Sequence, residues 1–210
     1  MSRIDFSLYL VTDRHQTAGR PLLSVLEQAL SAGVKAVQLR EKDLDTRSLA
    51  ELASEVASLT RKYNALLFIN DRVDLVMALG ADGVHLRSDS MPVRAARRVL
   101  GPNRLIGTSA HSVEEVLRAE TDGADFAVLG PIYDTPSKRE HGDPIGLRPL
   151  EDASLQSHIP IFAIGGISLP RVPEVRRVGA HGVALISAIL SVEQVQPATR
   201  LLLHALQTTE

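Results

Sequence analysis

Amide and cationic side chains alternate along a short apolar segment around residue 38. In the run AVQLREK, Gln38 and Arg40 flank Leu39, so in an extended strand both polar side chains point to the same side. Lys42 follows two residues later on that side. A buried arginine beside an amide is costly unless it pairs with an anion. We interpret this segment as one side of a diphosphate site, with a structural ion pair as the alternative.

Acidic side chains follow two later apolar runs. Asn70 and Asp71 come directly after LLFI, and Asp89 comes shortly after VHL. Taken singly, Asp71 is better explained as the cap of the next helix and Asp89 as an Asx turn. If the two segments end side by side next to phosphate-binding cations, however, two carboxylates predict a Mg²⁺ ion held partly by protein and partly by substrate phosphates.

A long polar loop and a glycine pair add candidate anion-binding groups. The loop GPIYDTPSKREHGDPIG carries Thr135, Ser137 and Lys138, whose hydroxyl and ammonium groups can bind phosphate oxygens. Its 139–145 segment is a candidate lid, or is merely solvated. In IGGI, Gly165 and Gly166 would let backbone N–H groups approach a phosphate, or would only relieve crowding at a strand end.

Two histidines, His85 and His111, also fall near the ends of apolar runs. Such histidines are more often structural than catalytic. His111 lies two residues beyond Ser109 and can exchange protons near neutral pH.

These residues are positioned by a regular alternation of strands and helices. Helical spacing of apolar residues lies between the strands, for example in 22–30, 49–59, 113–120 and 195–206. Eight runs have the character of strands: SLYLVTD, AVQLREK, LLFIND, GVHLR, LIGTSA, FAVLGPIY, PIFAIGGI and GVALISAIL. Eight is the number that closes a (β/α)8 TIM barrel, and no GxGxxG follows the first strand. We therefore predict one α/β domain over residues 1–210, a (β/α)8 barrel, with an open doubly wound sheet as the alternative.

Composition excludes several classes of function. The chain has 210 residues, 44% of them hydrophobic, and a formal net charge of −2. This balance gives no electrostatic reason to bind nucleic acid or an anionic membrane, so we expect small-molecule partners. The absence of cysteine excludes disulfides and thiolate chemistry.

No stretch approaches the roughly 20 apolar residues of a membrane span, and the start of the chain does not fit a signal peptide, so we expect a cytoplasmic protein. The sequence does not indicate an oligomeric state.

The motifs together resemble the thiamine phosphate synthase family, which includes the closely related thiazole tautomerase. The resemblance covers nearly the whole chain, and as a set the motifs are highly specific. They occur in the family's order and spacing: YLVTDR, VQLREK, FINDRVDL, GADGVHL, IGTSAH, GADFAVLGPIY, TPSK, AIGGIS and GVALISAI.

The resemblance implies a reaction and a role for each matching position. Pyrophosphate leaves the methylene group of a pyrimidine diphosphate, and the nitrogen of a thiazole phosphate attacks the resulting cation to form thiamine phosphate. The matching contacts to the pyrimidine diphosphate are Gln38, Arg40, Lys42, Asn70, Ser109 and Lys138, of which Arg40, Lys42, Ser109 and Lys138 are the expected catalytic residues. Asp71 and Asp89 match the Mg²⁺ ligands, and Thr135, Ser137, Gly166, Ile186 and Ser187 match the thiazole phosphate contacts, to which the glycine pair adds Gly165.

One departure from the family pattern concerns the metal. The family usually reads HLGQ, whereas this chain reads HLRS, with Arg87 and Ser88 just before Asp89. Arg87 either pairs with Asp89 and weakens Mg²⁺ binding, or reaches the diphosphate. Two other functions therefore stay open. One is a thiazole tautomerase with His111 as its acid and base, and the other is a non-catalytic barrel that binds a thiamine-related phosphate.

Overall fold

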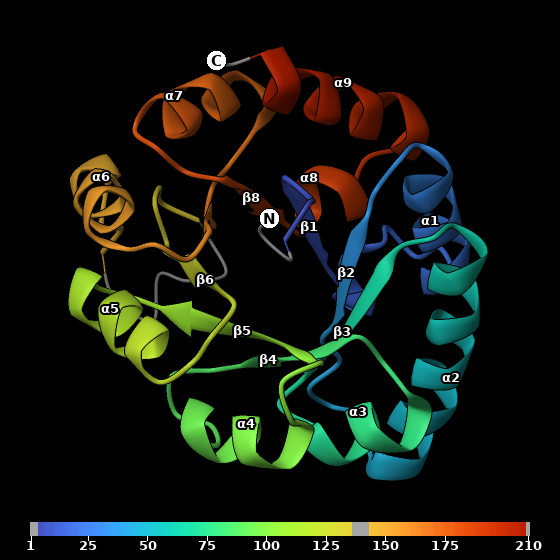
Figure 1. The fold of residues 1–210 in the computed structure, drawn as a ribbon. Helices are drawn as coiled ribbons and strands as arrows, with labels where there is room; N and C mark the ends of the chain where they lie inside the picture. Colours follow the sequence, from blue (N-terminus) through green and yellow to red (C-terminus); the bar gives the residue numbers. More distant parts are fainter. Residues whose placement is uncertain (1–3, 136–142, 209–210) are drawn as a thin grey trace.

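Eight parallel strands form one closed barrel in the computed structural model, which describes residues 4–135 and 143–208 (Figure 1). Each strand pairs with the next along the chain, and the last pairs with the first, for example Leu8 opposite Val183. The strands are β1 (Leu8–Val11), β2 (Ala36–Leu39), β3 (Leu66–Asn70), β4 (Gly83–Leu86), β5 (Leu105–Ala110), β6 (Phe126–Leu129), β7 (Ile161–Ala163) and β8 (Gly182–Leu185). The predicted (β/α)8 barrel is confirmed, and the open sheet is excluded.

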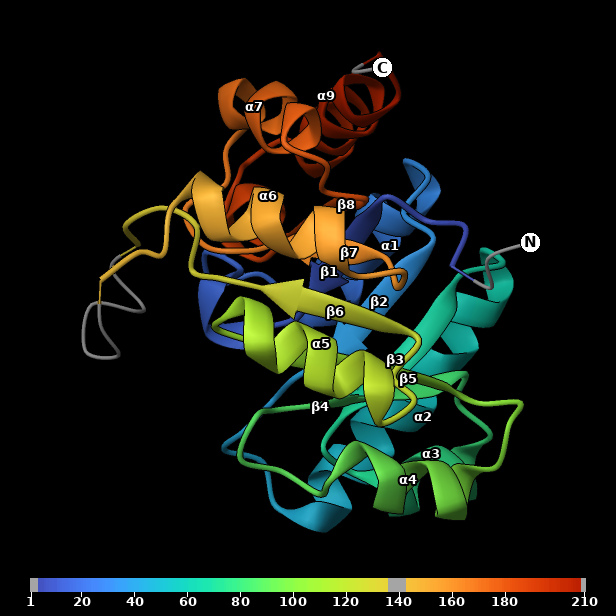
Figure 2. The same ribbon diagram turned by 60° about the vertical axis from the view of Figure 1, so that its left-hand side comes forward.

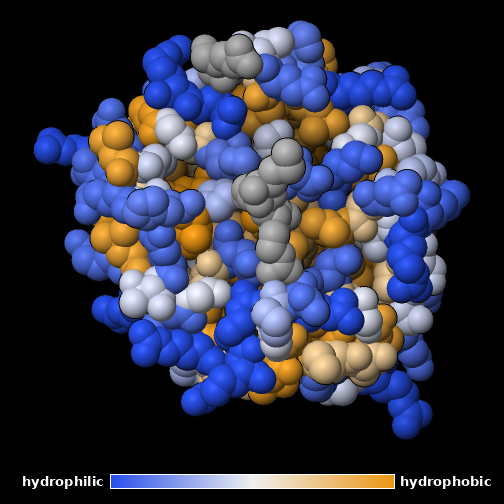
Figure 3. Space-filling view, in the orientation of Figure 1, coloured by the Kyte–Doolittle hydropathy of each residue, from blue (hydrophilic) through white to orange (hydrophobic). Residues whose placement is uncertain are grey.

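A ring of helices surrounds the strands (Figure 1). The α-helices are α1 (Leu22–Ser31), α2 (Thr46–Lys62), α3 (Val73–Leu79), α4 (Val93–Leu100), α5 (Val113–Thr121), α6 (Leu147–Gln156), α7 (Val172–Arg177), α8 (Ser187–Leu190) and α9 (Val195–Thr208). Short 3-10 helices occupy η1 (Arg14–Gln16) and η3 (Leu169–Arg171). The helices bury apolar residues in the core, against strands or neighbouring helices, which explains the helical spacing of apolar residues in the sequence. On the face shown in Figure 3, hydrophilic groups cover much of the periphery.

Most of the observed strands are shorter than the runs that predicted them, and the last run also contains the start of a helix. The run GVALISAIL reads as continuous strand, but β8 ends at Leu185. Ile186 leaves the strand conformation with φ −120° and ψ −90°, and Ser187 begins the single turn of α8. An apolar run buried on both sides does not by itself distinguish strand from helix, which is why the sequence pattern missed this boundary.

The barrel interior is filled with aromatic rings. All four phenylalanines of the chain, Phe6, Phe68, Phe126 and Phe162, lie there with Tyr9. Neighbouring ring centroids are 5.1 to 6.1 Å apart, many of them in edge-to-face geometry. Such pairs contribute about 0.5–1.5 kcal/mol each beyond the burial of area. The interior is therefore a packed core that supports the strand ends above it.

The carboxyl ends of the strands meet at one end of the barrel. Figure 2 shows β6 pointing away from the side on which the N-terminus is marked. Because the strands are parallel, the segments that follow them gather at the end to which β6 points. Within residues 4–135 and 143–208, no helix is long and apolar enough to cross a membrane.

Candidate functional site

A chain of hydrogen bonds joins three predicted residues at the ends of β2 and β3. Gln38 Nε2 donates to Asn70 Oδ1 at 2.9 Å, and Asn70 Nδ2 donates to Asp71 Oδ2 at 2.9 Å. A carboxylate only accepts, so it fixes the orientation of the Asn70 amide and, through it, that of Gln38. Gln38 is 3% exposed, and its Oε1 remains as an acceptor at the mouth of the barrel. The structure thus brings these three predicted site residues together.

The two predicted metal ligands lie on either side of one guanidinium group. Arg87 Nε is 2.7 Å from Asp71 Oδ2 and 3.4 Å from Asp89 Oδ1. Asp71 Oδ1 also accepts hydrogen bonds from the Arg87 backbone N–H at 3.1 Å and from the Ser90 hydroxyl. The helix-cap role considered for Asp71 is not observed, because the residue before α3 is Arg72 and its side chain makes no cap hydrogen bond. Arg87 therefore pairs more closely with Asp71 than with its neighbour Asp89.

The charge state of Asp71 follows from these contacts. Burial raises the pKa of Asp71, but the hydrogen bonds from Ser90 and Arg87, together with the charge of Arg87, outweigh burial and lower the pKa below its ordinary value. Asp71 is thus an ionised carboxylate at neutral pH, as a metal ligand must be. It also has φ +60°, a conformation that non-glycine residues rarely adopt and that is concentrated at functional positions.

A buried glutamate fixes the segment that carries Arg40 and Lys42. Glu41 has a side chain that is 1% exposed, and it accepts hydrogen bonds from Thr12 Oγ1 at 2.6 Å and from Arg14 Nη1 at 3.2 Å. Thr12 Oγ1 in turn accepts from the Arg40 backbone N–H at 2.9 Å. This network connects the loop after β2 to the loop after β1. In the loop after β2, Arg40 is half-buried at the mouth of the barrel and Lys42 is exposed. Sequence reasoning missed Glu41, although an acidic residue between two predicted phosphate contacts was a usable signal.

Ser109 is connected to a histidine and a tyrosine in the barrel interior. His85 Nε2 lies 3.0 Å from Ser109 Oγ, and His85 Nδ1 lies 3.4 Å from the Tyr9 hydroxyl. Burial lowers the pKa of His85 to about 3, so the ring is neutral at physiological pH. With Tyr9 donating to Nδ1, Nε2 carries the proton and donates to Ser109, whose own hydroxyl proton is then available to a ligand. The sequence favoured a structural role for His85, and the structure makes it a direct support of a predicted site residue.

The glycine pair after β7 permits close packing of the loop after β6. Gly166 has φ +64°, and a Cβ at this position would lie 2.7 Å from the Asp134 carbonyl oxygen. Tyr133 N donates to Gly165 O at 3.1 Å, and Arg171 Nη1 donates to Gly166 O at 2.5 Å while lying over the Tyr133 ring. This packing agrees with the view that the glycines relieve crowding, and phosphate binding by their N–H groups stays a prediction.

The remaining thiazole-side residues are only partly described. Thr135 is half-buried in the segment after β6, which packs against the glycine pair. Ile186 and Ser187 follow β8, the first half-buried and the second exposed. The structure describes the chain up to residue 135 and again from residue 143. Two predicted residues, Ser137 and Lys138, therefore lie outside the described residues, as does most of the candidate lid at 139–145.

His111 has one nitrogen fixed by the backbone. Its Nδ1 is 2.7 Å from the carbonyl oxygen of Gly130, and its backbone N–H donates to Glu115 Oε2 at 2.7 Å. A carbonyl oxygen only accepts, so Nδ1 carries a proton and Nε2 is the nitrogen that exchanges protons. The residue is exposed just after β5, beside the other strand ends.

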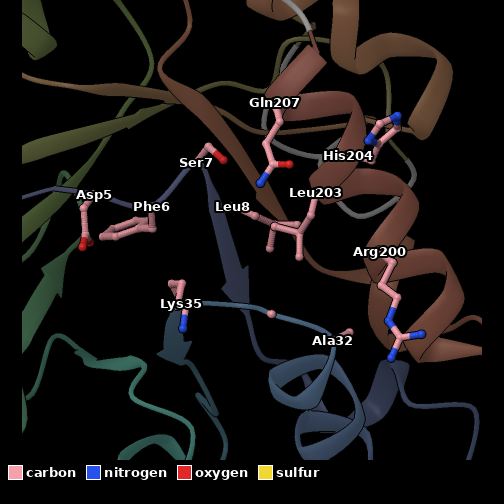
Figure 4. A pocket seen from close by; sticks show the side chains of 11 residues that line it. Asp5, Phe6, Ser7, Leu8, Ala32, Lys35, Arg200, Leu203, His204 and Gln207 are labelled. Carbon is pink, nitrogen blue, oxygen red and sulfur yellow. The ribbon is translucent and has the colours of Figure 1, made fainter.

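A separate cavity of about 400 Å³ opens at the opposite end of the barrel. Figure 4 shows Arg200, His204 and Gln207 on α9, with Lys35 just before β2 and Ser7 just before β1. These residues precede strands or lie on the last helix, whereas the predicted site residues lie at the carboxyl ends of strands or after them. The cavity is therefore not the site predicted from the sequence.

Fold and site together define a (β/α)8 barrel with cationic, amide and acidic side chains gathered at its strand ends. The sequence profile of thiamine monophosphate synthases matches residues 8–189. The chain belongs to this family.

Similar proteins support the same assignment. A protein of Geobacter sulfurreducens named "Putative thiamine-phosphate synthase" is 51% identical over 206 residues, which cover 98% of this chain and 97% of that one. The thiamine-phosphate synthase of Clostridium novyi is 42% identical, with 95% and 98% covered. The solved thiamine phosphate pyrophosphorylase of Pyrococcus furiosus superimposes with a TM-score of 0.88 at 37% identity, covering 97% and 96% of the two chains. A 3-hexulose-6-phosphate synthase, with a TM-score of 0.70 at 16% identity, shares the fold.

Proposed function

We propose that this chain is a thiamine phosphate synthase, a transferase that joins the pyrimidinylmethyl group of a pyrimidine diphosphate to a thiazole phosphate. The observation that carries the proposal is the full-length similarity to thiamine-phosphate synthases, such as the 42% identity over 95% of the chain. The geometry of the strand ends agrees with it, because amide, cationic and acidic groups lie where a diphosphate and its metal would bind.

The side formed by β2, β3 and β5 suits the pyrimidine diphosphate. The amide chain that begins at Asp71 leaves Gln38 Oε1 as an acceptor for the amino group of a pyrimidine. Ser109 offers a hydroxyl proton, and Arg40 and Lys42 supply positive charge for the phosphates. Lys138 would add a further cation from the loop after β6.

The metal ligands fit Mg²⁺ in number and type. Asp71 and Asp89 both lie within 3.4 Å of a single nitrogen, so their oxygens converge on one small region. In the described part of the chain, no group of three or more histidine, aspartate or glutamate side chains is placed to hold a metal ion. Two carboxylates leave coordination positions for phosphate oxygens and water, which is how Mg²⁺ usually binds. When bound, Mg²⁺ would neutralise negative charge on the diphosphate.

The opposite side of the mouth would hold the thiazole phosphate. Thr135 and Ser137 supply hydroxyls, and the backbone N–H groups at Gly165, Gly166 and Ser187 follow β7 and β8, where many barrels bind phosphate. Ile186 would supply an apolar contact beside them. The thiazole would then lie across the mouth from the diphosphate.

The reaction needs no nucleophile from the protein. The bond between the pyrimidine methylene carbon and the diphosphate oxygen breaks, and pyrophosphate leaves with the electron pair. The lone pair of the thiazole nitrogen then forms the new C–N bond. The protein orients the two substrates and stabilises the charge that develops on the leaving oxygen through Arg40, Lys42, Ser109 and Lys138.

The test is a two-substrate assay with purified protein. The pyrimidine diphosphate, the thiazole phosphate and Mg²⁺ should yield thiamine phosphate and pyrophosphate in equal amounts. Asp71→Asn should lower the rate about 100-fold, because it removes the charge that faces the metal. Asp74→Asn is the matched control, since Asp74 is an exposed residue of α3 paired with Arg72. Wild-type protein that forms no product would overturn the proposal.

A second candidate function is thiazole tautomerisation, which the geometry of His111 favours. The proton on Nδ1 leaves Nε2 as a base near the strand ends. If the two-substrate assay fails and the thiazole carboxylate phosphate is isomerised in a reaction abolished by His111→Gln, the tautomerase is the correct reading. Binding of thiamine-related phosphates without either reaction would indicate a non-catalytic barrel.

A further inference from the structure

The guanidinium of Arg87 lies where a metal ion held by the two aspartates would lie. Its Nε is 2.7 Å from Asp71 Oδ2 and 3.4 Å from Asp89 Oδ1. Mg²⁺ requires oxygen ligands at about 2.0–2.1 Å, so an ion bound by both carboxylates must enter the region that this guanidinium now fills. Two positive groups cannot share the region, because they exclude each other sterically and repel each other.

Arg87 is able to leave this position. Its side chain is 42% exposed, and the Asp71 carboxylate keeps three other donors when the guanidinium departs: the backbone N–H of Arg87 and the side chains of Ser90 and Asn70. Asp89 is 71% exposed, so its contact with Arg87 is also open to solvent. Ion pairs this exposed to water are weak, so a divalent ion can replace the arginine.

A displaced Arg87 would remain at the mouth of the barrel, close to Arg40. Burial lowers the pKa of Arg40; the charge of Asp13 raises it, and the positive charge of Arg87 lowers it, so Arg87 lies near enough to Arg40 for their charges to interact. Arg40 follows β2 and Arg87 follows β4, on either side of Asp71. Two arginines that repel each other are stabilised by a polyanion placed between them, and a diphosphate has the required charge.

We propose that Arg87 occupies the metal site in the free protein and, when Mg²⁺ displaces it, binds the diphosphate. This inference rests on the proposed function, because it assigns a role toward the same metal and diphosphate. If Arg87 acts in this way, the affinity for Mg²⁺ depends on the diphosphate. Mg²⁺ alone must compete with Arg87 for the two aspartates. When a diphosphate is also present, the displaced guanidinium gains a new partner. Arg87 thereby couples the binding of the two ligands, and the coupling acts equally in both directions.

The test measures two affinities that should change in opposite directions in Arg87→Ala. Mn²⁺, counted by electron paramagnetic resonance as a substitute for Mg²⁺, should bind the free variant about ten-fold more tightly than wild type, because its competitor is gone. The complex of Mg²⁺ with pyrophosphate, titrated by calorimetry, should bind about ten-fold more weakly, because one phosphate contact is lost. Arg87→Gln, which keeps a donor but no charge, should behave in the same way.

Controls separate this role from a structural one. Arg94→Ala removes another exposed arginine, one that pairs with Asp122 at 2.5 Å, and should leave both affinities unchanged. If both affinities fall in Arg87→Ala, or if neither changes, Arg87 has no coupling role and the inference is wrong. The same holds if Mn²⁺ binds more tightly but pyrophosphate binding is unaffected. If neither wild type nor Arg87→Ala binds Mn²⁺, the proposed metal site fails together with the inference.

Discussion

Lowering the pH from 8 to 5 should destabilise this protein through one buried side chain, His85. The residue is 2% exposed, and burial lowers its pKa to about 3. In the unfolded chain the pKa of histidine is about 6.5. The unfolded chain therefore binds a proton at this position that the folded protein does not bind. The resulting stability is complete above pH 6.5 and is lost as the pH falls toward 3.

The size of the effect at pH 5 follows from the unfolded state. At that pH the unfolded histidine is about 30-fold more often protonated than neutral, while His85 in the folded protein stays almost entirely neutral. A factor of about 30 corresponds to about 2 kcal/mol of unfolding free energy. This loss of unfolding free energy at pH 5 hardly depends on the exact pKa of His85 in the folded protein, provided that this pKa lies below about 4. It is a large share of the roughly 5–15 kcal/mol that stabilises an ordinary domain.

Urea unfolding between pH 5 and 8 measures this loss when wild type is compared with His85→Gln. Glutamine reaches toward Ser109 but does not titrate, so the variant should lose about 2 kcal/mol less than wild type between pH 8 and pH 5. The comparison with the variant is needed because burial also lowers the pKa of His181. His181 therefore also makes the protein less stable at low pH, and it does so equally in wild type and in the variant. His204→Gln, an exposed change on α9, should keep the wild-type profile. Equal pH profiles for wild type and His85→Gln would refute the assignment of a neutral buried His85.

Three further predictions concern the supports of the site and its metal. Glu41→Gln should lower the unfolding free energy by about 2 kcal/mol in urea denaturation, because the buried charge that accepts from Thr12 and Arg14 is lost. Gly107→Ala should lower the melting temperature by several degrees, with a cost of roughly 1–3 kcal/mol, because the added methyl group would overlap the ring of Phe126. An unchanged melting temperature would contradict this packing. Treatment with EDTA should abolish formation of thiamine phosphate, and added Mg²⁺ should restore it; full activity in EDTA would exclude a metal role.

The sequence by itself determined the architecture and the end of the barrel that carries the site. Alternating strand and helix patterns with eight strand runs predicted the barrel, because the period of apolar residues reports which faces are buried. Parallel strands bring every strand end to one side, so the sequence assigned Gln38, Asn70 and Asp71 to the same end of the barrel. The hydrogen-bond chain among these three shows that they are also direct neighbours there.

Only the tertiary structure decided which side chains are partners across the barrel. Tyr9 and His85 are 76 positions apart, and their contact depends on how the closed barrel turns residues of β1 and β4 into one interior. Likewise the sequence placed Arg87 beside Asp89, yet the fold brings it closer to Asp71, which lies 16 positions away at the end of β3. The pattern and spacing of apolar residues indicate which positions are buried and where strands end. Which side chains contact each other depends on strand register, on the curvature of the barrel and on side-chain rotamers, and all three are determined by the closed fold.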